Sequence, residues 1–168
     1  MRFIWREPLG RSVRVRGKTA GAEKTASPLS ENVEMYLETV FVLTEQGGRA
    51  RTTDVAHGWR VAPSSATEMI QRLAGAGYLE YEPYHGVELT AKGLTLARGV
   101  VRKHRLLETF LTREVGLKGP RVAEYACEME HVLPEEVERW MCATLGHPTE
   151  SPLGGAIPPG ACCARARR

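Results

Sequence analysis

The stretch TTDVAHGWRVAPSSATEMIQRLAGAGYLEYEPYHGVELT, residues 52–90, decides the fold. Thr52 opens a short helix that stops near Gly58, and a second helix starts at Pro63-Ser64-Ser65, because Ser, Asp or Thr before a helix and Pro in its first turn are typical of helix starts. The apolar residues of the second helix fall on one face: Ala66, Met69, Ile70 and Leu73. Two short helices joined by about four residues predict a helix-turn-helix.

The segments on either side extend this motif. Residues 79–81 and 87–90 alternate like strands around the turn at 83–86, which predicts a two-stranded wing. Upstream, apolar side chains recur at three- and four-residue steps from Ser30 to the Gly47-Gly48 pair and predict a helix with Ser30 as its N-cap. Helix, helix-turn-helix and wing together predict a winged helix, which usually binds DNA; a winged helix used only for protein contacts is the alternative.

The second helix of the motif, residues 63–76, is the expected recognition helix. The Pro63 ring can press on a thymine methyl, and Gln71 is suited to an adenine edge, whereas Ser64 and Ser65 serve equally well as helix caps. Arginines in and near the motif, Arg49 and Arg60 among them, are candidate phosphate contacts. Such contacts would position the protein on DNA without reading the base sequence. The predicted DNA-binding residues are Arg51, Pro63, Ser64, Ser65, Thr67, Gln71 and Arg72.

The second half of the chain predicts a helical domain. A long helix from Ala91 to about Val115 carries His104 and Glu108 one turn apart, and a further helix carries Cys127, Glu130 and His131 at spacings of three and four. Sulfur, oxygen and nitrogen donors on one helical stripe predict a transition-metal site. The alternative is a helix with a buried cysteine and a structurally satisfied histidine.

A last helix is expected from Pro134 to Gly146, with Val137, Trp140 and Met141 facing inward. Beyond it we expect a C-terminal tail. Cys162-Cys163 in that tail is interpreted as an exposed, adventitious pair, with an extra metal or redox site as the alternative.

Charge and composition bound the function. The net charge of +3 conceals seven Lys/Arg against two acids in residues 1–30 and three arginines in the last four residues, so the central body carries about −5. Residues 1–29 are predicted to be a disordered basic arm. The chain lacks any run of 18 apolar residues and any CxxC pair, which predicts a cytoplasmic protein with no membrane partner and no disulfide framework.

Several segments carry a family resemblance. The runs EMYLE (34–38), APSS (62–65), LTAKG (89–93), RKHRL (102–106) and EHVLPEEVE (130–138) resemble the metal-dependent repressors of the diphtheria toxin repressor and manganese transport regulator family. The resemblance spans residues 30 to about 158. It implies a homodimer that binds double-stranded DNA at a near-palindromic operator, and a mainly α fold in which a winged helix-turn-helix precedes an α-helical metal-binding and dimerisation domain.

The resemblance also implies metal ligands, and here the sequence mixes two branches of the family. In the iron branch, positions matching Met35, Cys127, Glu130 and His131 form a primary site, and His104 and Glu108 match an ancillary site whose remaining histidine falls at Ala123, which cannot coordinate. In the manganese branch a binuclear site uses the positions of Met35 and Cys127, which are acidic there, together with Glu38, His104, Glu130 and His131. The predicted ligands are Met35, Glu38, His104, Glu108, Cys127, Glu130 and His131.

The expected cofactor is Fe²⁺ or Mn²⁺, with Co²⁺, Ni²⁺ or Zn²⁺ binding in a test tube, and the expected function is metal-activated repression of iron or manganese homeostasis genes without enzymatic activity. The expected organisation is a basic arm (1–29), a DNA-binding domain (30–92), a metal-binding and dimerisation domain (93–146) and a tail (147–168) with no SH3-like domain. Two alternatives remain at this point: a winged-helix regulator without metal sensing, and a zinc hydrolase, because Cys127-x-x-Glu130-His131 is one residue from the H-x-x-E-H signature.

Overall fold

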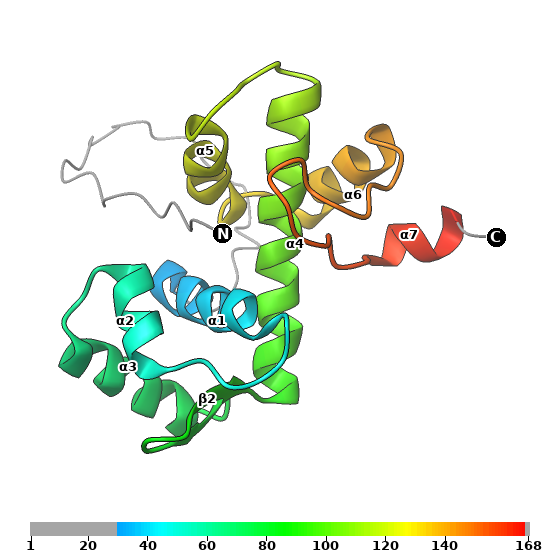
Figure 1. Ribbon diagram of the computed structural model, residues 1–168. Coiled ribbons are helices and arrows are strands. Elements are labelled where there is room, and N and C mark those ends of the chain that lie inside the picture. Colours follow the sequence, from blue (N-terminus) through cyan, green and yellow to red (C-terminus); the bar gives the residue numbers. More distant parts are fainter. Residues whose placement is uncertain (1–29, 167–168) are drawn as a thin grey trace, which may run out of the picture.

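The long helix α4 (Ala91–Arg113) is the axis of the molecule (Figure 1). The structure, a computed structural model, describes residues 30–166, so the predicted basic arm at 1–29 lies outside the described residues. The elements that precede α4 gather around its first half, and α5 (Arg121–Glu130) and α6 (Glu135–Thr144) lie along its second half. The described residues are mainly helical and include a two-stranded antiparallel sheet, as predicted.

The N-terminal half is a winged helix-turn-helix. Helix α1 (Glu31–Thr44) is followed by α2 (Thr52–Trp59), α3 (Pro63–Gly75) and the wing strands β1 (Leu79–Glu82) and β2 (Gly86–Leu89). The Tyr36 and Trp59 rings stack with their centroids 4.6 Å apart and join α1 to α2. The core shared by these elements contains fully buried aliphatic side chains, namely Leu37, Val40, Val55, Ile70 and Val87.

Local backbone geometry explains how the wing is attached. Pairing of Ala50 with Val87 adds a short bridge to the hairpin. Gly86 has φ +102, and a Cβ there would lie 2.6 Å from the Ala50 carbonyl oxygen, so glycine permits both the turn and this close approach. Arg49, a candidate phosphate contact, pairs with Glu82 and Glu88 of the wing.

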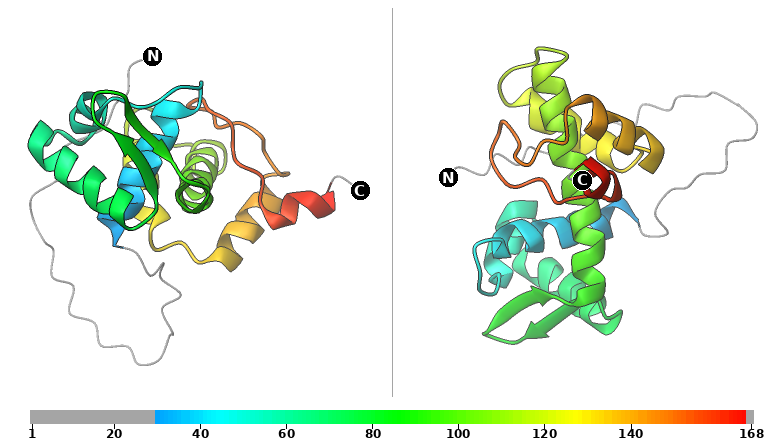
Figure 2. Two further views of the ribbon diagram at one scale, coloured as in Figure 1. Left: turned by 90° about the horizontal axis from the view of Figure 1, so that it is seen from below. Right: turned by 90° about the vertical axis from the view of Figure 1, so that its right-hand side faces the viewer.

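The second half packs onto α4 from two sides, as the views in Figure 2 show. Val122 and Ala126 of α5 bury against Leu107 and Leu111 of α4. Helix α6 presents Cys142, which is fully buried against Leu106.

The prediction that Val137 and Trp140 of α6 face inward is wrong. Val137 is 38% exposed and Trp140 is 63% exposed, whereas Met141 is half-buried as expected. The spacing of apolar residues on a helix shows which face they share, but it does not show whether that face packs against the chain's own core. In α6 the fully buried residue is Cys142.

The C-terminal segment does not form an exposed tail. It returns along α4, and a further helix, α7 (Ala161–Ala166), follows the helix that we expected to be the last. Ile157 and Cys163 are buried against Leu106, and Cys162 is half-buried, so the interpretation of Cys162-Cys163 as an exposed pair is wrong. Among the described residues, no helix is both long enough and apolar enough to span a membrane.

Candidate metal centre

Three helices meet at Glu130, which is 1% exposed at the end of α5. Its Oε2 lies 2.6 Å from Nδ1 of His104 on α4. Oε1 of Glu38, on α1, lies 3.9 Å from the same nitrogen. The structure therefore brings side chains that are almost a hundred positions apart in the sequence into one buried cluster.

His104 is held between acids on both sides. Its Nε2 lies 3.1 Å from Oε1 of Glu108, the residue one turn later on α4, and the other carboxylate oxygen of Glu108 accepts a hydrogen bond from the Ser151 hydroxyl. Burial alone would lower the pKa of His104, but the hydrogen bonds to Glu108 and Glu130 raise this pKa well above its ordinary value. In the absence of a metal, the positive charge of protonated His104 partly neutralises the negative charge of these carboxylates.

His131, the residue that follows α5, is oriented by an acid that the sequence did not indicate. Its Nδ1 lies 2.7 Å from Oε2 of Glu34, which is buried on α1. A carboxylate on one ring nitrogen fixes the imidazole tautomer and leaves the other nitrogen as a metal donor. Glu34 stands four positions before Glu38 and thus on the same helix face, which is the signal that could have revealed it.

Three buried polar atoms around this cluster have no hydrogen-bond partner among the described residues: Glu38 Oε2, Glu130 Oε1 and His131 Nε2. The last two lie 3.2 Å apart. Buried polar atoms are normally satisfied because an unmade hydrogen bond is costly. Two carboxylate oxygens and one imidazole nitrogen without hydrogen-bond partners can coordinate a divalent cation. These residues therefore fit a metal.

The charges around the cluster also fit a cation. Burial and repulsion by Glu130 raise the pKa of Glu38 to about 8. Burial, Glu130 and Glu38 raise the pKa of the Cys127 thiol to about 12. A divalent ion would relieve this repulsion and favour the ionised forms.

Potential ligand atoms fall into two groups that share Glu130. Cys127, Glu130 and His131 form one group, and Glu38, His104 and Glu130 form the other, with the donor atoms of each group within 4.8 Å of one another. Five predicted ligands are thus brought together, and Glu108 is attached to them through His104. Met35 is half-buried on α1, three residues before Glu38, and stays a predicted ligand.

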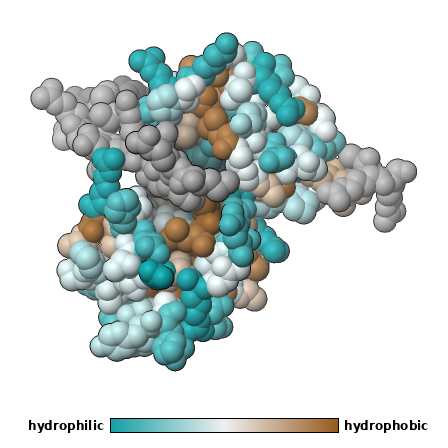
Figure 3. Space-filling view, viewed as in Figure 1, coloured by the Kyte–Doolittle hydropathy of each residue, from teal (hydrophilic) through white to brown (hydrophobic). Residues whose placement is uncertain are grey.

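The predicted DNA-binding residues lie on and beside α3. Pro63, Ser64, Ser65, Gln71 and Arg72 are exposed along this helix, and Arg51 is exposed immediately before α2. Thr67 is half-buried, and its hydroxyl donates to the Pro63 carbonyl oxygen. Figure 3 shows a mainly hydrophilic surface over this half of the molecule, with smaller apolar areas.

Two family models match the chain. The N-terminal DNA-binding domain of iron-dependent repressors matches residues 28–87, and the metal-binding and dimerisation domain of the same repressors matches residues 90–159. The chain belongs to the iron-dependent repressor family. Members are DNA-binding, dimerising transcriptional repressors and not enzymes, which excludes the zinc-hydrolase alternative for this family member.

Similar proteins include both iron and manganese regulators. The iron-dependent repressor IdeR of Mycobacterium leprae is 36% identical over 130 residues, which are 77% of this chain and 56% of IdeR. An HTH-type transcriptional regulator of Methanocaldococcus jannaschii is 36% identical over 65% of this chain and 88% of its own length. A solved manganese-dependent transcriptional repressor with bound manganese is 33% identical with a TM-score of 0.67, over 77% of this chain and 59% of that one. This repressor-family chain therefore spans little more than half the length of IdeR and of the manganese repressor.

Proposed function

We propose that this chain is a metal-activated, DNA-binding transcriptional repressor that acts in the cytoplasm as a homodimer. The observation that carries the proposal is the set of buried, unpartnered donors contributed by α1 and α5, Glu38 Oε2, Glu130 Oε1 and His131 Nε2. Because α1 belongs to the winged helix and α5 to the helical half, a shared ligand set couples the position of the DNA-binding domain to metal.

In this proposal each residue has a distinct role. Glu38, His104, Glu130, His131 and Cys127 hold the metal, Glu34 orients the His131 ring, and Glu108 orients His104. When bound, the ion supplies the positive charge that keeps Glu38 and Glu130 ionised side by side. Stabilising one arrangement of α1 against α4 and α5 favours DNA binding by that arrangement, with a coupling typical of about 1–3 kcal/mol.

The donor set suggests Fe²⁺ or Mn²⁺ as the activating ion. Carboxylate and imidazole donors suit Mn²⁺, whereas the Cys127 thiolate is softer and favours iron, cobalt, nickel or zinc. Similar proteins are named for both metals. We further propose that the two ligand groups sharing Glu130 bind two ions, with Glu130 contributing to both.

The proposed dimer surface lies on the helical half. The exposed large apolar residues of α5, α6 and the turn between these helices are Tyr125, Met129, Val132, Val137 and Trp140. The family model that matches this half describes a dimerisation domain. A Trp140→Glu variant is therefore expected to shift the protein toward monomer in analytical ultracentrifugation, whereas Tyr84→Glu, at an exposed aromatic of the wing, leaves the sedimentation coefficient unchanged.

The central experiment measures whether metal controls DNA binding. A random-sequence duplex pool is selected on the full chain in Mn²⁺, and the selected duplex is then titrated by fluorescence anisotropy with Mn²⁺, with anaerobic Fe²⁺ and with a chelator. Metal is expected to tighten binding about 5- to 150-fold, which corresponds to the coupling above. The Glu130→Gln variant is expected to lose most of this gain.

The matched control is Glu128→Gln, which makes the same change at an exposed position of α5 two residues away. It is expected to keep the metal response. Equal DNA affinity with metal and with chelator in the unaltered chain would leave only the regulator without metal sensing.

A further inference from the structure

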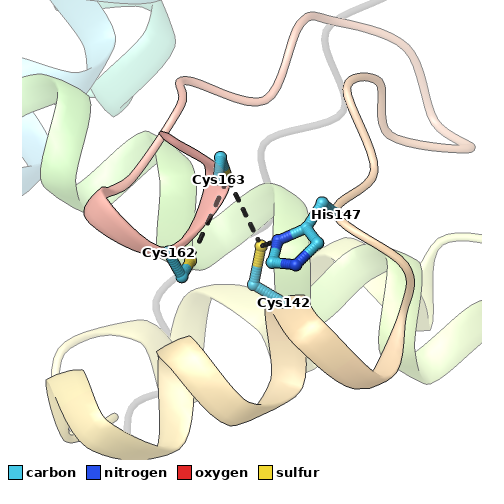
Figure 4. A group of neighbouring side chains, drawn as sticks. All are labelled: Cys142, His147, Cys162 and Cys163. Carbon is cyan, nitrogen blue, oxygen red and sulfur yellow. Dashed lines mark hydrogen bonds between the residues drawn. The ribbon is translucent and has the colours of Figure 1, made fainter. Parts of the chain in front are cut away.

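A second group of potential metal ligands lies away from Glu130, between α6, α7 and the loop that follows α6. It consists of Cys142, His147, Cys162 and Cys163, and the four donor atoms lie within 4.8 Å of one another. Figure 4 shows the three sulfur atoms and the imidazole gathered at the end of α6. The group shares no residue with the candidate metal centre described above.

The distances within the group resemble the edges of a metal tetrahedron. Cys142 Sγ lies 3.7 Å from Cys163 Sγ and 3.4 Å from His147 Nδ1, and Cys162 Sγ lies 3.9 Å from Cys163 Sγ. A tetrahedral Zn²⁺ with Zn–S of about 2.3 Å and Zn–N of about 2.0 Å separates two sulfurs by about 3.8 Å and sulfur from nitrogen by about 3.5 Å. All four cysteines of the chain are free thiols, so the spacing is not imposed by a disulfide.

The backbone after α6 places the histidine. Gly146 and His147 have φ +73 and +54, and the His147 amide donates to the Cys142 carbonyl oxygen at 2.8 Å. This left-handed turn brings the His147 ring back over the Cys142 sulfur. A non-glycine residue in that region costs about 1 kcal/mol or more and persists where its surroundings hold it.

The approach of α7 places the remaining two thiols. The buried Arg102 of α4 donates to the Pro158 carbonyl oxygen at 2.7 Å and to Cys162 Sγ at 3.3 Å, while its Nε pairs with Glu138 of α6 at 2.6 Å. A Cβ at Gly160 would lie 2.6 Å from the Arg102 Nε, so glycine lets the chain pass directly over the guanidinium. A guanidinium beside the cluster favours thiolates, which are the metal-binding form of cysteine.

We propose that Cys142, His147, Cys162 and Cys163 bind a tetrahedral Zn²⁺ ion that fastens α7 to α6 and α4. Three thiolates and one imidazole make a soft donor set of the kind found in closed structural zinc sites, and distinguish it from the carboxylate-rich centre around Glu130. Cys142 and Cys163 are buried, as a structural site requires. The inference goes beyond the proposed repressor function and does not depend on it.

The test uses Co²⁺ as a spectroscopic probe on the full chain, purified under reducing conditions and stripped with chelator. Co²⁺ bound by several thiolates is expected to give an intense sulfur-to-cobalt charge-transfer absorption and the visible bands of tetrahedral cobalt, and Zn²⁺ is expected to abolish both. The signal should survive Cys127→Ala, because Cys127 belongs to the other centre, and should disappear in Cys142→Ser.

A second variant covers the case in which the Cys142 replacement does not fold, since Cys142 is completely buried. His147→Asn removes the imidazole at a half-buried loop position, and asparagine tolerates the left-handed backbone. With its circular dichroism unchanged, this variant is expected to retain one equivalent less Zn²⁺ per chain after dialysis against a weak chelator. Unaltered zinc content in folded His147→Asn, or a cobalt spectrum lost with Cys127→Ala alone, would overturn the inference.

The same variants separate this site from the proposed function. Glu130→Gln is expected to lose metal-dependent DNA binding and keep the cobalt-thiolate spectrum, whereas His147→Asn is expected to lose the spectrum and keep the Glu130 centre. A Cys142–Cys163 disulfide found by mass spectrometry in zinc-free chain that was freshly purified under reducing conditions would also overturn the zinc site.

Discussion

The buried acids at the candidate metal centre place protons where a metal would bind. Glu38 has a pKa of about 8 because burial and the neighbouring Glu130 disfavour its charge, and hydrogen bonds to Glu108 and Glu130 keep His104 protonated above its ordinary pKa. A raised carboxylate pKa means that ionisation opposes folding, so the metal-free protein should lose stability as pH rises from about 4.5 to about 8.

Metal affinity should show the opposite dependence on pH. Below about pH 8 a metal must displace the Glu38 proton, so the observed Mn²⁺ affinity is expected to rise with pH toward that value and each binding event to release protons. Calorimetric titrations in two buffers of different ionisation enthalpy measure the release directly. The same affinity at about pH 6 and about pH 8 would show that Glu38 and His104 do not bind the ion.

Glu34 allows a test of ligand orientation, because it contacts Nδ1 of His131 and not Nε2, the nitrogen that is free to bind metal. Glu34→Gln should lower Mn²⁺ affinity by about 10- to 100-fold, since the His131 ring loses the carboxylate that orients it. The matched control is Glu31→Gln, an exposed acid in the first turn of the same helix. If both variants bind Mn²⁺ like the unaltered chain, Glu34 has no positioning role.

At the scale of elements, the start of α4 is fitted closely to the wing. A Cβ on Gly93 would lie 2.0 Å from the Tyr78 carbonyl oxygen, while Gly99, six residues later on the same helix, has open space around it. Thr90 caps α4 by accepting from the Gly93 amide and also donates to the Gly77 carbonyl oxygen. The junction between the wing and α4 therefore requires glycine at position 93.

This difference between two glycines of one helix predicts opposite effects. Gly93→Ala should reduce the free energy of unfolding by about 1–3 kcal/mol through overpacking, whereas Gly99→Ala should increase it by about 0.5–1 kcal/mol through helix propensity. Urea unfolding of the metal-free chain, followed by circular dichroism, measures both. A stabilising Gly93→Ala would mean that Tyr78 and α4 do not pack this closely in solution.

At the scale of the whole molecule, Arg105 ties three distant segments together. Its guanidinium makes two bonds to Glu45 at the end of α1, 2.6 and 2.7 Å long, and donates to the Ala156 carbonyl oxygen in the C-terminal segment. Gly155 has φ +97, and a Cβ there would lie 2.7 Å from the guanidinium. The DNA-binding half, α4 and the returning C-terminal segment thus share one buried cation.

Replacing this cation with lysine tests the arrangement. Lysine keeps the charge but cannot bond Glu45 through two nitrogens while reaching Ala156, so Arg105→Lys should cost about 1–3 kcal/mol of unfolding free energy. Arg98→Lys, at an exposed position of α4, should change stability by less than about 0.5 kcal/mol. Equal unfolding midpoints for the two variants would contradict a structural role for the Arg105 bonds.

The sequence by itself determined the winged helix, the helical second half and most of the candidate ligands. Helix starts such as Pro63, the alternation around Gly86 and the spacing of Cys127, Glu130 and His131 are local patterns, and local patterns follow from the 3.6- and 2-residue periods of the backbone. The family resemblance added Glu38, which no local spacing connects to α5, whereas His104 was already a candidate through its one-turn spacing with Glu108.

Only the tertiary structure decided which side chains meet across long sequence separations. It brought Glu34 to His131, turned Trp140 outward, and folded Cys162 and Cys163 back onto Cys142. Such contacts depend on how helices pack and where a loop returns, which is set by burial summed over the whole chain. A periodic pattern shows that a residue has a face, but only packing determines what covers that face.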